Sequence, residues 1–169
     1  MAVKLNFQTV ALSEIRLITA HPHAAPQPLV LVVDDEQVIA DTLAAILSRS
    51  GYTALTAYDG ASALETAHLI PPQMMITDVS MPGMSGIELA IAVRESVPDC
   101  KVLLFAGQSS TADLLAAARD AGYEFEALAK PIHPTELLAR VSKCLTGPAR
   151  DTPESWSFLR RAQREPRSS

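Results

Sequence analysis

The sequence predicts an α/β protein built on a doubly wound, five-stranded parallel sheet. Between residues 29 and 146, five short apolar runs alternate with stretches in which apolar residues recur at helical spacing. Such alternation is typical of a parallel sheet with helices on both faces. Hydrophobic residues make up 48% of the 169-residue chain, which is enough to build a core of this size.

The expected strands are short and almost continuously apolar, as is usual for strands that are buried on both faces. In chain order they cover Leu29–Val33, Thr53–Ala57 and residues 74–77, 102–105 and 125–129. The last of these runs gives the weakest signal.

Each run is followed by a helical pattern. The expected helices are Val38 to Gly51, residues 60–70, residues 87–94, a fourth helix opened by the capping-box-like pair Ser110 and Asp113, and a fifth that begins at Pro134. We expect His133 to start this last helix and to have no chemical role.

Two tails are expected to flank a domain over residues 29–146. Residues 1–28 form an N-terminal extension that ends in a linker with three prolines, and a short helix is possible over residues 7–20. Residues 147–169 are rich in Arg, Ser and Pro and are expected to be mostly disordered. The alternative for this tail is a short docking or membrane-surface helix containing Trp156, Phe158 and Leu159.

Charge and composition exclude several classes of protein. Residues 29–146 carry 7 Lys/Arg and 15 Asp/Glu, a formal charge of −8, which argues against a nucleic-acid-binding surface. No apolar run approaches the roughly 20 residues of a membrane-spanning helix, and charged residues interrupt any secretory signal. Cys100 and Cys144 are too few for a disulfide framework, so we expect reduced thiols in a cytoplasmic protein.

Three aspartates and one lysine directly follow the expected strands. Asp34 and Asp35 come after the first run, Asp78 comes after the third, and Lys130 comes after the fifth. In open parallel sheets, ligands bind beyond the carboxyl ends of the strands, where the strand order reverses. The order 2-1-3-4-5 places strands 1 and 3 side by side at that point, so the positions of the acids favour this order.

A pocket with three acids and one lysine is suited to a divalent cation and a phosphoryl group. Mg²⁺ prefers oxygen ligands and relieves the repulsion between neighbouring carboxylates. We expect Asp35 and Asp78 to bind it directly, Asp34 to act through water, and the carbonyl oxygen of Ser80 to be a further ligand. Asp78 is the candidate nucleophile for an aspartyl phosphate, with Lys130 as a point charge for the phosphoryl oxygens.

These motifs resemble the receiver domain of bacterial two-component response regulators. The resemblance is carried by the Asp34-Asp35 pair, by the string DVSMPGMSG that begins at Asp78, and by Lys130-Pro131, in this order. It covers about residues 29–146 and depends on three separate motifs, which makes it specific.

The resemblance implies a flavodoxin-like receiver fold, Mg²⁺ as the cofactor, and a histidine kinase or histidine phosphotransfer protein as the phosphoryl donor. It makes Asp78 the phosphoacceptor, Asp34 and Asp35 the metal pair, and Lys130 the family's invariant lysine. It also implies a cis peptide bond before Pro131. The protein would then be no enzyme beyond catalysing its own phosphorylation and dephosphorylation.

The signalling route follows from the length of the tail and from the same resemblance. The 23 residues after Thr146 are too few for a DNA-binding or catalytic domain, so we expect a stand-alone regulator that signals through contacts with an unknown downstream protein. In the family, the usual surface for such contacts is formed by strands 4 and 5 and the last two helices.

Two positions depart from the family pattern. Ala106 replaces the Thr or Ser whose hydroxyl binds the phosphoryl group, and Ala127 replaces the switch aromatic, with Phe125 two residues earlier. The loss of a hydrogen bond to a charged group is worth roughly 1.5–3 kcal/mol, which weakens the switch without abolishing phosphorylation.

These departures leave an alternative function open, namely a degenerate receiver that acts as an unphosphorylated interaction or scaffold module. A phosphohydrolase with an aspartyl nucleophile fits less well. Such enzymes carry a second aspartate two residues after the nucleophile, whereas Glu36 follows Asp34 and Ser80 follows Asp78 at that distance. Taken singly, Asp34 or Asp35 could merely cap the first helix, and Asp78 could be a turn residue.

Overall fold

A computed structural model of the chain describes residues 26–107 and 111–147. Its centre is a five-stranded sheet with the order β2-β1-β3-β4-β5, and all four strand pairs are parallel. This confirms the predicted fold class and strand order. The strands are β1 (Leu29–Val33), β2 (Thr53–Ala57), β3 (Met74–Asp78), β4 (Lys101–Ala106) and β5 (Glu126–Ala129).

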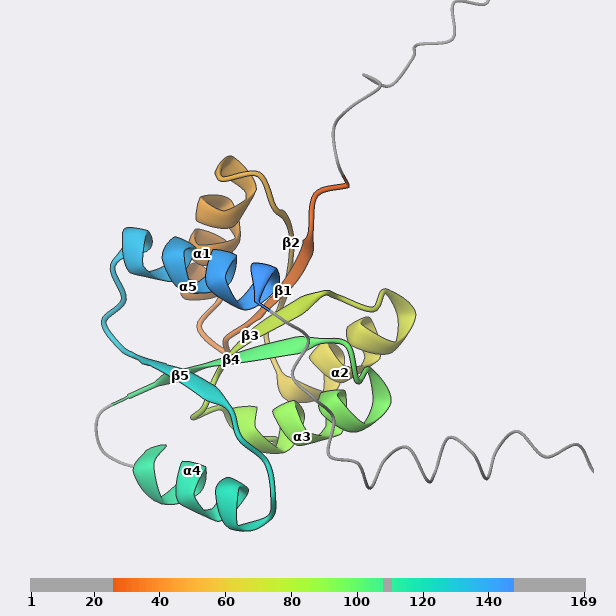
Figure 1. Cartoon of the computed structure of the whole chain (residues 1–169), viewed down its shortest axis with the longest axis vertical. Helices are drawn as coiled ribbons and strands as arrows, with labels where there is room; N and C mark the ends of the chain where they lie inside the picture. Colours follow the sequence, from red (N-terminus) through yellow and green to blue (C-terminus); the bar gives the residue numbers. More distant parts are fainter. Residues whose placement is uncertain (1–25, 108–110, 148–169) are drawn as a thin grey trace, which may run out of the picture.

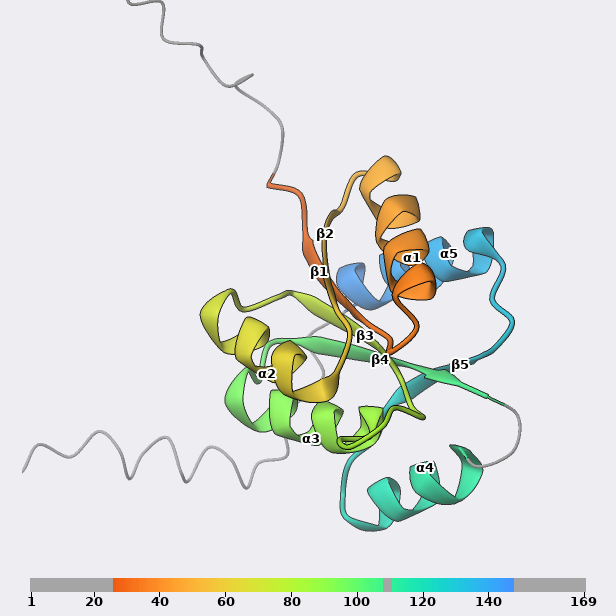
Figure 2. The same ribbon diagram turned by 180° about the vertical axis from the view of Figure 1, so that it is seen from behind.

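Helices cover both faces of the sheet and divide the core into two layers (Figures 1 and 2). The helices are α1 (Gln37–Arg49), α2 (Gly60–Leu69), α3 (Gly86–Ser96), α4 (Thr111–Asp120) and α5 (Pro134–Thr146). One buried cluster lies under α1 and α5 and includes Leu47 and Leu137, whereas the other lies under α2 and α3 and includes Ala63 and Leu89. Each face of the sheet therefore contributes side chains to its own apolar layer, as doubly wound sheets require.

The predicted element bounds are right within one or two residues at most ends. β3 includes Asp78, β4 is one residue longer at each end than expected, and β5 starts one residue later than expected. Ser110, residues 1–25 and residues 148–169 lie outside the described residues, as do the predictions made for them. In the described part of the chain, no helix is long and apolar enough to cross a membrane.

α1, α2, α3 and α5 start within one residue of the predicted positions, and the differences from expectation lie in how the helices are capped. Glu36 is the N-cap of α1 and makes no side-chain cap bond, so the idea that Asp34 or Asp35 caps this helix is wrong. α3 begins with a complete capping box between Ser85 and Glu88, which was not predicted from the sequence. His133 does cap α5, because its side chain accepts a hydrogen bond from the amide of Thr135.

The two thiols differ in their surroundings, which gives a first prediction. Cys100 is buried, and this burial raises the pKa of its thiol to about 12, whereas Cys144 is half-buried on α5. Because thiolates are the reactive species, Cys100 should react with iodoacetamide at least about tenfold more slowly than Cys144 in the folded protein. Peptide mass mapping over time measures both rates, and equal rates under native conditions would contradict the burial of Cys100.

Candidate functional site

The register of the sheet brings the carboxyl ends of four strands to one edge. Val33 of β1 pairs with Thr77 of β3, which pairs in turn with Leu104 of β4. Ala106, at the end of β4, pairs with Ala129 at the end of β5. The residues that follow or end β1, β3 and β5 therefore meet at one place, where the chain carries Asp34, Asp78 and Lys130.

Lys130 connects the two buried aspartates. Its Nζ atom lies 2.7 Å from Oδ1 of Asp78 and 3.1 Å from Oδ2 of Asp34. Asp34 is 1% exposed and Asp78 is 6% exposed, and together with Thr77 they are the buried polar or charged residues of the described ranges. The predicted convergence of these three side chains is thus present, although Asp34 and Lys130 are 96 positions apart in the sequence.

The remaining carboxylate oxygens are held by backbone amides. Oδ1 of Asp34 accepts a hydrogen bond from the amide of Glu36 at 3.0 Å, and Oδ2 of Asp78 accepts one from the amide of Ser80 at 3.0 Å. Among the described residues, every buried side-chain polar atom has a partner. Both carboxylates are therefore fixed in orientation before any ligand binds.

The charges of this group support one another. Burial of the Lys130 ammonium lowers its pKa, but the hydrogen bonds and negative charges of Asp78 and Asp34 outweigh this effect, so the pKa lies above its ordinary value. Lys130 is therefore fully charged at neutral pH and offers a fixed positive charge beside the Asp78 carboxylate.

The chemistry of the oxygen donors fits Mg²⁺. Asp35 and Ser80 are exposed, next to the buried Asp34 and Asp78 respectively. In residues 26–107 and 111–147, no group of three or more His, Cys, Asp or Glu side chains is arranged to hold a metal ion. Mg²⁺ is usually held by only one or two carboxylates, with water and phosphate oxygens completing its shell, so two carboxylates are a sufficient protein contribution.

The backbone of Asp78 is braced by its neighbours. The hydroxyl of Thr77 donates a hydrogen bond to the carbonyl oxygen of Asp78 at 3.0 Å, and the amide of Gly86 donates one to the carbonyl of Val79 at 3.0 Å. A Cβ atom on Gly86 would lie 1.9 Å from the Asp78 carbonyl oxygen. The first turn of α3 can approach Asp78 this closely only because residue 86 has no side chain.

Gly86→Ala should therefore destabilise the protein and displace Asp78. Overpacking of this kind typically costs about 1–3 kcal/mol, which urea unfolding followed by circular dichroism would detect. Gly107→Ala is the matched control, because a Cβ atom there meets no atom of the described residues within 4 Å. Equal stability of the two variants would contradict the close approach of α3 to Asp78.

The positions that depart from the family pattern surround the same edge. Ala106 is half-buried at the end of β4, and its carbonyl accepts a hydrogen bond from the amide of Lys130 at 2.9 Å. Phe125 and Ala127 both pack against the apolar cluster that lies under α2 and α3, so both face the side of the sheet that α3 covers. The guanidinium of Arg94 on α3 lies 5.1 Å from the centre of the Phe125 ring. Phe125 is thus held against α3.

The cis peptide bond between Lys130 and Pro131 is present, as the resemblance implied. A family model for the response regulator receiver domain matches residues 30–142, which include every residue of the site. The chain belongs to the response regulator receiver family.

Curated relatives agree with this membership. Response regulator MprA of Mycobacterium ulcerans is 35% identical over 116 residues, which are 69% of this chain and 49% of that protein. Transcriptional regulatory protein PrrA of Mycobacterium tuberculosis is 36% identical over 118 residues, which are 70% of this chain and 50% of that protein. The receiver thus spans about half the length of the curated relatives it matches.

Solved structures have the same fold. Chemotaxis protein CheY4 of Vibrio cholerae matches with a TM-score of 0.63 at 30% identity, over 70% of this chain and 99% of that one. A CheY-like receiver domain protein of Methanospirillum hungatei matches with a TM-score of 0.64 at 25% identity, over 70% and 94% of the two chains. The receiver therefore has the flavodoxin-like architecture of CheY-like proteins.

Proposed function

We propose that this receiver takes a phosphoryl group from a histidine kinase or a histidine phosphotransfer protein onto Asp78. The observation that carries the proposal is the contact of Lys130 Nζ with Oδ1 of Asp78 at 2.7 Å and with Oδ2 of Asp34 at 3.1 Å. An ammonium at this position can bind the phosphoryl oxygens while the group is transferred to Asp78.

In the proposed step, a carboxylate oxygen of Asp78 attacks phosphorus. The new O–P bond forms as the N–P bond to the donor imidazole breaks, and the imidazole nitrogen keeps the bonding electron pair. During this step, the Lys130 ammonium contacts the phosphoryl oxygens and stays in contact with Asp34. The Ser80 amide, which already holds Oδ2 of Asp78, keeps the carboxylate aligned for attack.

Mg²⁺ is the proposed cofactor. Asp35 and Asp78 would hold it directly, Asp34 through water, and Ser80 through its carbonyl oxygen. When bound, the ion supplies positive charge for the phosphoryl oxygens, which is the main requirement of phosphoryl transfer.

The output of the phosphorylated receiver is proposed to be a protein contact. The surface of β4, β5, α4 and α5 is the proposed docking face for a downstream protein, and the acidic charge of residues 29–146 makes nucleic acid an unsuitable partner. This corresponds to a cytoplasmic response regulator that is no enzyme beyond turning over its own phosphoryl group.

A degenerate receiver is the second candidate function. Ala106 has no hydroxyl for the phosphoryl group, and Arg94 of α3 lies over the ring of Phe125, which favours a static module. In this case the protein would bind its partner equally well with and without a phosphoryl donor.

Acetyl phosphate separates the two candidates. Incubation of the protein with Mg²⁺ and acetyl phosphate, followed by intact mass measurement, should give one phosphoryl adduct that EDTA prevents. The absence of any adduct would favour the degenerate receiver that acts as an unphosphorylated scaffold module.

A hydroxyl restored at position 106 should strengthen the response. Ala106→Thr adds a donor at the end of β4, and a hydrogen bond to a charged group is worth roughly 1.5–3 kcal/mol, equivalent to about ten- to hundredfold in the stability of the phosphorylated form. The lifetime of the adduct after removal of acetyl phosphate measures the effect, and Ala106→Val is the control of similar shape. Equal lifetimes in both variants would show that residue 106 does not contact the phosphoryl group.

A further inference from the structure

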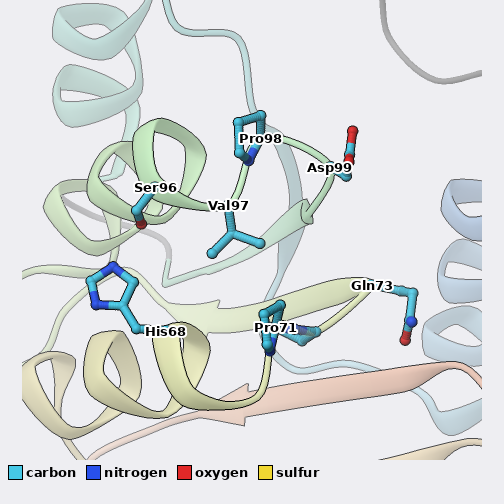
Figure 3. Close-up of a pocket in the computed structure, with 8 residues that line it drawn as sticks. His68, Pro71, Gln73, Ser96, Val97, Pro98 and Asp99 are labelled. Atoms are coloured by element: carbon cyan, nitrogen blue, oxygen red, sulfur yellow. The ribbon is translucent and has the colours of Figure 1, made fainter. Parts of the chain in front are cut away.

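A hollow of about 360 Å³ lies at the edge of the sheet opposite to Asp34 and Asp78. It separates the end of α2 from the end of α3, so that Val97 and Pro98 face His68 and Pro71 across it (Figure 3). Asp99 is the one residue of its lining with a formal charge at neutral pH. The complete lining is His68, Pro71, Pro72, Gln73, Ser96, Val97, Pro98 and Asp99.

Exposed apolar side chains continue this hollow on its α2 side. Leu69 is 74% exposed and Ile70 is 51% exposed, directly before Pro71. They are two of the five large hydrophobic residues that are exposed in the described ranges, and they are adjacent in sequence. An exposed apolar patch next to a hollow is typical of a surface that another segment covers.

The chain after α5 leaves from the same edge. The carbonyl oxygen of Gly147 accepts a hydrogen bond from Nζ of Lys101 at 3.0 Å, and Lys101 lies two residues after Asp99. Trp156 is nine residues after Gly147, and an extended chain of that length spans about 30 Å. Residues 156–159 can therefore reach the hollow without any change in the described fold.

The composition of that segment complements the surface. Trp156, Phe158 and Leu159 are apolar, and Arg160 and Arg161 follow them directly. Residues 148–169 carry five Arg against three acids, a formal charge of +2, whereas residues 29–146 carry −8. Aromatic side chains also bury a large area at little cost in conformational entropy, which suits them to anchor a docked segment.

We propose that residues 156–159 of the same chain dock in the hollow between the ends of α2 and α3, with Trp156 as the anchor and Arg160 and Arg161 near Asp99. The docked segment covers Leu69 and Ile70. This site is separate from the proposed phosphoacceptor Asp78, which lies at the opposite edge of the sheet, and docking does not depend on phosphorylation.

Trp156 is the only tryptophan of the chain, so its fluorescence reports the docking directly. In the full chain, the emission should be shifted to the blue relative to a peptide of residues 148–169. Docking for half of the time would lower acrylamide quenching about twofold. The double variant Leu69→Glu/Ile70→Glu should return both readings to those of the peptide, because a charged surface cannot cover the indole.

Leu114→Glu is the matched control, since Leu114 is an exposed apolar residue on α4. It should leave emission and quenching unchanged, and circular dichroism should show equal folding of all variants. Three results would overturn the proposal. These are emission like that of the free peptide in the unaltered chain, a blue shift that survives Leu69→Glu/Ile70→Glu, and a shift that depends on protein concentration, which would assign the hollow to a second copy.

Discussion

Replacing Asp78 by asparagine is expected to abolish the phosphoryl adduct formed with acetyl phosphate and Mg²⁺. The amide of asparagine is neutral and lacks the anionic oxygen that attacks phosphorus, so the rate should fall by at least about hundredfold. The variant also loses the charged contact with Lys130, which lies 2.7 Å from Oδ1 of Asp78 in the unaltered protein. Intact mass measurement over time gives the rate.

Asp120→Asn is the control for this experiment. Asp120 is an exposed carboxylate at the end of α4, so its removal changes the net charge by the same amount without touching the site. This variant should form the adduct at the rate of the unaltered protein. An adduct that persists in Asp78→Asn would assign the phosphoryl group to another residue.

Lys130→Met should impair both phosphorylation and stability. Without the ammonium, Asp34 and Asp78 lose their shared counter-charge, and hydrogen bonds to charged groups contribute about 1.5–3 kcal/mol each when buried. Lys130 is 28% exposed, so solvent screening reduces this contribution, and we expect a total loss of about 1–3 kcal/mol in the free energy of unfolding. The phosphorylation rate should fall at least about tenfold, because the variant has no ammonium to stabilise the charge on the phosphoryl oxygens.

Urea unfolding with and without Mg²⁺ tests this stability effect. Mg²⁺ should restore more stability to Lys130→Met than to the unaltered protein, because the ion binds a carboxylate pair that has lost its ammonium. Lys143→Met, at an exposed position on α5, should change neither stability nor phosphorylation. Equal stability of Lys130→Met and the unaltered protein would show that the three-residue contact is not formed in solution.

The sheet could be predicted almost completely from the sequence. Continuous apolar runs indicate buried parallel strands. The order of the strands follows from the residues at their ends, because Asp34 and Asp78 can belong to one site only when β1 and β3 are neighbours. The side chains that cap the helices were less accessible from the sequence. The capping box of Ser85 and Glu88 at the start of α3 is recognisable in the sequence but was not predicted, whereas the pair expected at the start of α4 includes Ser110, which lies outside the described residues.

The convergence of Asp34, Asp78 and Lys130 was predictable from the sequence, but the individual contacts between them were not. The strand ends indicate which residues meet, yet the bridging of Asp34 and Asp78 by Lys130 depends on side-chain directions that a linear pattern does not contain. The same is true of Arg94 and Phe125, which are 31 positions apart and meet only because α3 packs against the segment before β5. The close approach of Gly86 to the Asp78 carbonyl likewise appears only in three dimensions.

The central claim is that Asp78 is the phosphoryl-accepting residue of a site completed by Lys130 and Asp34. The most direct measurement is borohydride reduction of the protein after treatment with acetyl phosphate and Mg²⁺, followed by peptide mass mapping, because this reduction converts an aspartyl phosphate into homoserine. The account predicts homoserine at position 78 and at no other position. Homoserine at another aspartate, or unmodified aspartate throughout, would contradict it.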